Sequence, residues 1–248
     1  MSEIRNLNIV IVGVGGQGTL LASRILSTLA LKLGLDVKAS EIHGMAQRGG
    51  SVVTFVRMGE RVYAPMVEEG GADYVLAFEQ LEAMRAVGYL KKGGVMIANT
   101  QKMSPMPVVT GAAKYPENVL ESLTQKCALD AFDALSLAHE AGDGRAVNVV
   151  LIGALARRVG GDAEIWRDAV RACVPPKFLE INLRAFDAGY KIYRRNITHG
   201  NPSHLEPCGR MHAARATARA SIGALEERRA PRIRQCAAVP PPHGRKGH

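Results

Sequence analysis

The chain has no apolar run long enough to cross a membrane. No stretch of its 248 residues reaches the roughly twenty consecutive apolar side chains that a transmembrane helix requires. The start of the chain, Met1–Arg5, also lacks the basic and apolar pattern of a signal peptide. These two absences argue against a membrane protein and a secreted protein, and we expect a cytoplasmic one.

Closely spaced cysteines are absent too. The chain has only four cysteines, and no two of them show C-x-x-C spacing: Cys127, Cys173, Cys208 and Cys236. Zinc sites, iron–sulfur clusters and the disulfide frameworks of small domains all depend on clustered cysteines. We therefore expect that this chain holds no metal ion or cluster by itself, and that its thiols are structural.

The chain has fewer acidic than basic residues, and most of this difference lies in one segment. The net charge is +9, and residues 196–248 contribute +6 of it, with nine Lys or Arg against three Glu. That segment also holds five of the seven histidines and shows no sustained apolar periodicity. We expect a folded domain over residues 1–195 and a basic, disordered tail over 196–248. The nearly balanced domain gives no support to a nucleic-acid role.

The tail leaves three interpretations open. It is a disordered extension, an arm that binds RNA or a membrane surface, or an out-of-frame extension of a GC-rich gene, as its bias toward Arg, Ala, Pro, His and Gly suggests. Deletion of residues 196–248 separates a dispensable tail from a functional one.

A glycine-rich turn organises the rest of the chain. Gly13-Val14-Gly15-Gly16-Gln17-Gly18 follows the apolar run Ile9–Val12 and precedes a stretch with helical periodicity, Thr19–Leu33. Strand, glycine turn and helix in this order leave backbone N–H groups at a helix N-terminus, where they favour a phosphate or another anion. The G-x-G-x-x-G spacing fits a dinucleotide site, although such turns also serve close packing alone.

The later segments predict an α/β fold of Rossmann-like type, with a mostly parallel sheet. Strands are expected over 37–42, 73–79, 95–98 and 128–132, and helices over 80–87, 116–125, 133–140, 148–159, 163–172 and 177–193. Residues 51–57 and 62–64 around the turn 58–61 predict an inserted β-hairpin. Val108-Val109 predicts a short extended piece. The C-terminal third is expected to be helical.

The segment Ser40–Ser51 is the second unusual stretch. It places an acid, an imidazole, a guanidinium and three glycines directly after a predicted strand. Because loops at the carboxyl ends of parallel strands meet at one edge of a sheet, this segment and the glycine turn should lie together. We predict a binding or interface loop here. The predicted ligand-binding set is Gly13, Gly15, Gly16, Gln17, Gly18, Glu41, His43, Arg48 and Gly49.

Two of these residues have specific chemistry. Arg48 presents a planar fork that suits a phosphate or a carboxylate. His43 is a candidate general acid, although a structural hydrogen bond explains it equally well.

Several segments together resemble the gamma-type domain of the 2-oxoacid:ferredoxin oxidoreductases. The likeness covers about residues 5–193, and the Ser40–Gly50 segment is its most specific motif. The segments that carry it are Gly13–Gly18, Ser40–Gly50, Ala77–Ala83 and Asn148–Ala154. Within the family, the chain is similar to the small subunits of members that act on arylpyruvates such as indolepyruvate. The tail has no counterpart in this resemblance.

The resemblance implies a subunit that is not active alone. In that family a large (alpha) subunit carries thiamine diphosphate and the iron–sulfur clusters, and the complex decarboxylates a 2-oxoacid oxidatively, reduces ferredoxin and makes an acyl-coenzyme A. This chain would bind no cofactor tightly. Its glycine turn would meet a phosphate of coenzyme A, and the loop of His43 and Arg48 would line the cleft toward the large subunit.

A free-standing NAD(P)-dependent reductase is the alternative. Glu41 lies 23 residues after Gly18, near the end of the predicted second strand, where an acid that binds ribose belongs. The glycine-rich loop, the inserted hairpin and the lack of a hydride-transfer site weigh against it. The sequence leaves the preferred arylpyruvate and the stoichiometry of the complex open.

Overall fold

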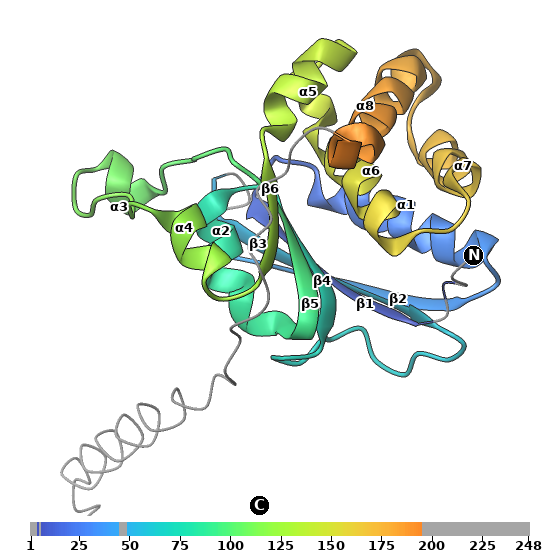
Figure 1. Ribbon diagram of the computed structural model, residues 1–248, viewed down its shortest axis with the longest axis horizontal. Helices are drawn as coiled ribbons and strands as arrows, with labels where there is room; N and C mark the ends of the chain where they lie inside the picture. The colour runs from blue at the N-terminus through green and yellow to red at the C-terminus, as the bar shows by residue number, and fades with distance from the viewer. Residues whose placement is uncertain (1–3, 5, 45–48, 195–248) are drawn as a thin grey trace, which may run out of the picture. The chain divides into compact units, whose positions relative to one another are not determined.

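The computed structural model of the protein describes residues 4, 6–44 and 49–194, and the structural statements below concern these residues (Figure 1). The six strands are β1 Leu7–Val14, β2 Asp36–His43, β3 Ser51–Gly59, β4 Ala72–Ala77, β5 Leu90–Asn99 and β6 Ala128–Phe132. The α-helices are α1 Thr19–Lys32, α2 Gln80–Ala86, α3 Met106–Val109, α4 Val119–Thr124, α5 Ala134–Ala141, α6 Val147–Val159, α7 Ala163–Cys173 and α8 Leu179–Lys191. The 3₁₀ turns are η1 Val87–Tyr89, η2 Gly144–Ala146, η3 Pro176–Phe178 and η4 Ile192–Arg194.

The strands form one sheet in the order β2-β3-β1-β4-β5-β6. β1, β4, β5 and β6 pair in parallel, whereas β3 runs antiparallel to both β1 and β2. The predicted mostly parallel α/β sheet is therefore confirmed. The central strand β1 carries the apolar run Ile9–Val12, whose residues are at most 1% exposed because both faces of the sheet are covered.

The predicted hairpin around residues 58–61 is wrong in its second strand. Residues 62–64 form no strand, and β3 instead forms a hairpin with the preceding strand β2, with Asp36 opposite Gly59 and His43 opposite Val52. The reason is that β1 and β2 occupy both edges of β3, so no edge is left for a returning strand. The backbone N–H of Val62 instead donates to Asp36 Oδ2 over 2.9 Å.

Helices cover both faces of the sheet, as Figure 1 shows. One face carries α1 and the C-terminal helices, whose core includes Ile25, Leu29, Leu151 and Phe186. The other face carries the smaller cluster of α2 and α4, with Val10, Val75 and Leu123 in its core. In the described part of the chain, no helix is both long and apolar enough to cross a membrane.

The helices near the C-terminus fit the prediction closely. α6 is buried from Val147 to Ala156, and Trp166 on α7 is 1% exposed, as expected of a core residue. The buried Asp130 on β6 forms an ion pair with Arg158 on α6, whose side chain is 33% exposed, with oxygen–nitrogen distances of 2.5 and 2.6 Å. The Tyr193 hydroxyl also donates to Asp130, at 2.8 Å, and fastens the end of the described chain to the sheet.

Two predicted segments differ from the structure. Val108 and Val109 lie in the short helix α3 rather than in an extended piece, because Pro107 at the helix start fixes a helical φ and overrides the strand preference of valine. The helix expected from Pro116 begins only at Val119, after Asn118 in a left-handed conformation with φ 53°. The predicted tail, residues 196–248, lies outside the described residues.

Candidate functional site

The direction in which successive strands are added to the sheet reverses at β1. From β1 it passes through α1 to β2 and back along β3, and then crosses to β4 on the other side of β1. In open α/β sheets, ligands bind at such a switch point, in the crevice outside the carboxyl ends of the strands. The loops that follow β1, β2, β4 and β5 therefore define the candidate site.

The glycine turn after β1 has the backbone that the sequence predicted. Gly16 and Gly18 have φ of +105° and +87°, which L side chains rarely adopt. Gly18 also precedes α1 directly, and a Cβ there would lie 2.4 Å from Asn148 Nδ2. The Asn148 amide donates to Gly18 O over 3.2 Å, so α6 packs against the turn.

Gln17 shapes this turn from inside. Its Oε1 accepts a hydrogen bond of 2.8 Å from Val14 N, and its Nε2 donates to Phe78 O at 3.2 Å and to Gln101 Oε1 at 3.4 Å. The buried Asn99 amide donates to the same two acceptors, each at 3.3 Å. This amide network ties the ends of β1, β4 and β5 together, and it gives Gln17 a structural role beside its predicted binding role.

Fewer N–H groups of the turn are free than the sequence suggested. Gly15 N donates to Gly50 O at 2.8 Å, and Gln17 N donates to Val14 O at 3.1 Å. Among the described residues, Gly16 N and Gly18 N have no hydrogen-bond acceptor of this kind. α1 has no side-chain cap and no acidic residue in its first turn. The start of α1 therefore keeps unpaired donors and a positive dipole end, which suit an anion.

The predicted loop lies against the glycine turn. Besides the bond from Gly15 to Gly50, Gly49 N donates to Gly15 O over 3.3 Å, which confirms that the two segments share one edge of the sheet. His43 is exposed at the end of β2, and its Nδ1 lies 3.1 Å from Gly44 O. Its proposed role as an acid stays a prediction. Arg48 lies outside the described residues.

Glu41 has protein partners of its own. Its Oε2 accepts hydrogen bonds from Thr19 Oγ1 at 3.0 Å and from Thr54 Oγ1 at 2.9 Å. These bonds tie the first residue of α1 to β2 and β3. Because β3 separates β2 from β1, Glu41 does not stand on the strand beside the glycine turn.

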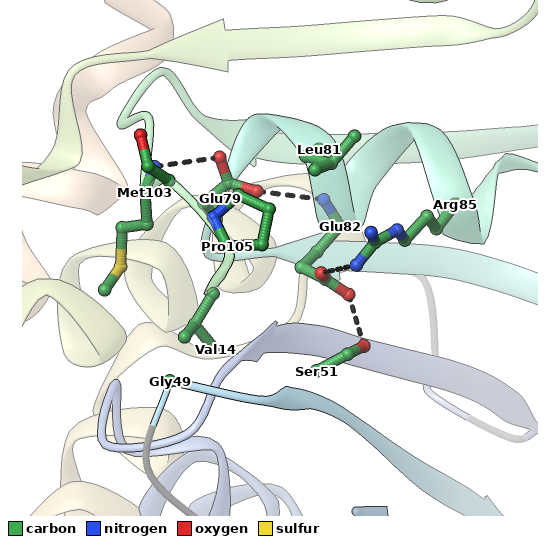
Figure 2. Close-up of a pocket in the computed structure, with 10 residues that line it drawn as sticks. Val14, Gly49, Ser51, Glu79, Leu81, Glu82, Arg85, Met103 and Pro105 are labelled. Carbon is green, nitrogen blue, oxygen red and sulfur yellow. Dashed lines mark hydrogen bonds and ion pairs between the residues drawn. The ribbon is translucent and has the colours of Figure 1, made fainter. Parts of the chain in front are cut away.

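A pocket opens at the switch point, between the end of β1 and the start of α2 (Figure 2). Its walls include Val14, Gly49, Ser51, Glu79, Glu82, Arg85 and residues 103–105. Two carboxylates line it, and both are nearly inaccessible: Glu79 is 1% and Glu82 is 4% exposed. Since buried carboxylates need partners, their contacts determine what the pocket can do.

Glu82 holds one wall of the pocket. Ser51 Oγ, at the start of β3, donates to Glu82 Oε2, and Arg85 Nη1 donates to Glu82 Oε1, each over 2.5 Å. The Arg85 side chain is half exposed, and among the described residues its guanidinium bonds only Glu82. Its other N–H groups are available to an anionic ligand.

Glu79 holds the opposite wall. Its Oε2 caps α2 by accepting from Glu82 N at 3.0 Å, and its Oε1 accepts from Met103 N at 3.1 Å and from the Tyr115 hydroxyl. Burial, followed by the hydrogen bond to Glu79, raises the pKa of Tyr115, so its hydroxyl remains a donor at neutral pH.

Burial also raises the pKa of the Cys127 thiol to about 11, in keeping with a structural cysteine.

The sequence pointed to the turn and to the loop that ends at Ser51, but the predicted ligand-binding set did not include Ser51, Glu79, Glu82 or Arg85. Glu79, Glu82 and Arg85 follow β4 at intervals of three residues, a spacing that places Glu82 and Arg85 on one face of a helix. The sequence spacing alone therefore indicates that Glu82 and Arg85 lie together. It does not indicate the hydrogen bond between Ser51 and Glu82, because that contact depends on the position of β3 in the sheet.

Several known proteins are similar to this chain in sequence or in fold. The family model described as pyruvate ferredoxin/flavodoxin oxidoreductase matches residues 8–192. The indolepyruvate oxidoreductase subunit IorB of Pyrococcus horikoshii is 46% identical over 202 residues, which cover 78% of this chain and 99% of that protein. The gamma subunit of a keto/oxoacid ferredoxin oxidoreductase from Geobacter sulfurreducens superposes with a TM-score of 0.56 at 26% identity, over 75% of this chain and 96% of that one.

A longer relative contains the same domain. The ketoisovalerate oxidoreductase subunit VorA of Methanothermobacter marburgensis is 31% identical over 200 residues, which cover 79% of this chain but only 38% of that protein. In VorA, therefore, the domain is joined covalently to a further part of greater length.

Proposed function

Because the chain belongs to the pyruvate ferredoxin/flavodoxin oxidoreductase family, we propose that it works in an enzyme that oxidatively decarboxylates arylpyruvates such as indolepyruvate. The chain is the small subunit of a ferredoxin-dependent 2-oxoacid oxidoreductase complex, and it acts with a larger subunit. The observation that carries the substrate class is the 46% identity to an indolepyruvate oxidoreductase subunit of which 99% is covered.

Enzymes of this family depend on thiamine diphosphate, which stabilises the carbanion left by decarboxylation, and on iron–sulfur clusters, which pass electrons on to ferredoxin. We place both in the larger subunit. The scattered cysteines of this chain support that assignment. The products are carbon dioxide, reduced ferredoxin and the aryl-acetyl-coenzyme A.

This chain contributes binding and orientation. The free N–H groups at the start of α1 are proposed to receive a phosphate of coenzyme A. Gln17 and its amide network fix the position of those donors, and Arg85, itself positioned by the buried Glu82, supplies a guanidinium at the neighbouring pocket. His43, Arg48 and Gly49 are proposed to line the cleft toward the larger subunit.

The nicotinamide alternative is not supported. The relatives are oxidoreductase subunits of a different class, and the carboxylate of Glu41, which would bind a ribose, accepts two hydrogen bonds from protein hydroxyls.

Reconstitution tests the function. The full chain is mixed with the larger subunit, indolepyruvate, thiamine diphosphate, coenzyme A and ferredoxin, and ferredoxin reduction is followed. We expect turnover that requires both subunits. Equal activity of the larger subunit alone would contradict the proposal.

A charge change tests the coenzyme A site. Leu20 lies in the first turn of α1 and is 59% exposed. Leu20→Glu suits the helix dipole but repels a phosphate, so we expect it to raise the KM for coenzyme A about tenfold or more without lowering thermal stability. Leu20→Gln, of similar size and uncharged, is the matched control. Equal KM values for the two variants would show that no phosphate of coenzyme A binds at this position.

A further inference from the structure

Residues 103–114, between β5 and α4, form an arm that stands apart from the other elements, with α3 near its tip (Figure 1). The arm is well exposed: Met106 and Val109 expose 67% and 65% of their surface. These two side chains are three residues apart on α3 and therefore lie on one helix face.

The composition of the arm is unusual for an exposed loop. Residues 103–113 carry no charged side chain, and Lys114 at the end of the arm is its one charged residue, whereas 22% of the residues in the whole chain are charged. Met, Pro and Val make up much of the segment. Depletion of charge together with enrichment in Met is typical of the centre of a protein–protein interface and not of a loop that faces water.

The arm has a defined shape without a partner. Backbone hydrogen bonds run from Val109 N to Pro105 O at 3.0 Å, from Thr110 N to Met106 O at 2.9 Å and from Ala113 N to Pro107 O at 2.9 Å. The buried Glu79 carboxylate accepts hydrogen bonds from Met103 N, at the start of the arm, and from the Tyr115 hydroxyl, directly after its end. A preformed surface of this kind loses little conformational freedom when it binds.

The arm also adjoins the candidate site. Met103, Ser104 and Pro105, at its base, line the switch-point pocket across from Gly49. A protein that packed on Met106 and Val109 would consequently lie next to residues that line the pocket. In VorA the same domain is covalently joined to a further part of the enzyme, which is consistent with a permanent neighbour at one of its surfaces.

We propose that the arm of residues 103–114 is a docking element for the larger subunit, with Met106 and Val109 inserted into an apolar recess on it, and that Glu79 fixes the angle at which the arm is presented. This inference rests on the proposed function, because it takes the larger subunit as the occupant. It assigns to that subunit a specific contact beside the site that the complex completes.

The test measures the affinity of the full chain for the larger subunit by biolayer interferometry. Met106→Ser/Val109→Ser is expected to weaken binding about tenfold or more. The matched control is Leu31→Ser/Tyr63→Ser, which changes two side chains that are 67% and 80% exposed, one on α1 and one in the loop after β3. We expect the control to bind within about twofold of the wild type.

Each outcome decides the matter. Weakening of the arm variant alone supports the proposal. Unchanged affinity, or equal weakening of both variants, overturns it. If the arm variant abolishes self-association of this chain but leaves its binding to the larger subunit intact, the occupant is a second copy and the proposal is wrong. Failure of the wild-type pair to bind at all would instead count against the proposed function.

Discussion

Glu79 is a buried residue on which several local features depend. It is 1% exposed, and it accepts hydrogen bonds from a helix start, from the backbone of Met103 and from a tyrosine hydroxyl. A buried carboxylate with three donors is well satisfied, whereas the donors alone would be left without an acceptor in a dry environment. The residue is therefore both a cap and the anchor of the docking arm.

Glu79→Ala should lower the free energy of unfolding by about 3 kcal/mol, because three buried or half-buried donors lose their acceptor. Glu79→Gln keeps the size and one oxygen, and should cost about half as much. Chemical denaturation with urea measures both. A loss below about 0.5 kcal/mol for the alanine variant would mean that water replaces the carboxylate without difficulty.

Among the helices, α6 and α8 make the closest packing. A Cβ on Gly189 would lie 1.8 Å from Val150 O, and a Cβ on Gly153 would lie 2.1 Å from Phe186 O. Only glycine permits the two backbones to approach so closely. α6 also carries Asn148, which bonds the glycine turn, so the α6–α8 contact supports the position of the turn.

Gly189→Ala should destabilise the protein by about 3 kcal/mol, since α8 must move away from α6. Gly88→Ala is the matched control, because a Cβ at Gly88 meets nothing within 4 Å, and we expect it to stay within about 0.5 kcal/mol of the wild type. Differential denaturation of the two variants tests this. Equal stability would show that the helices separate at little cost.

Element prediction from the sequence succeeded where one segment determines its own structure. The glycine turn, α1, β6, α6 and α7 lie within a residue or two of the predicted bounds, because their apolar periodicity and their glycines are local signals. The antiparallel insertion of β3 between β1 and β2 was missed. Periodicity identifies a strand but does not identify its neighbours, and Ser51 meets Glu82 only through that choice of neighbours.

At the scale of the whole molecule, the family accounts for one part of the chain. The family model ends at residue 192, and the 78% of this chain that aligns with the Pyrococcus relative covers 99% of that relative. The basic segment 196–248 lies beyond the residues that the family model matches.

Deletion of residues 196–248 should leave the midpoint of thermal unfolding and the affinity for the larger subunit unchanged, because the buried core and the proposed docking arm lie within residues 7–192. Thermal denaturation and interferometry on the full and shortened chains measure the two quantities. A lower midpoint, loss of solubility or weaker binding would assign a working role to the tail.

The central position of β1 affects the order in which the protein can form during synthesis. β1 leaves the ribosome first, yet its hydrogen-bonding partners β3 and β4 begin only at residues 51 and 72. The β2–β3 pair joins strands that are close in sequence and is the quickest antiparallel contact available to the nascent chain. Once formed, it offers β1 an edge long before α6 and α8 arrive. Because β3 precedes β4 in the chain, β1 gains its first neighbouring strand before β4 is synthesised, which limits the exposure of an apolar inner strand that is prone to aggregate when unpaired.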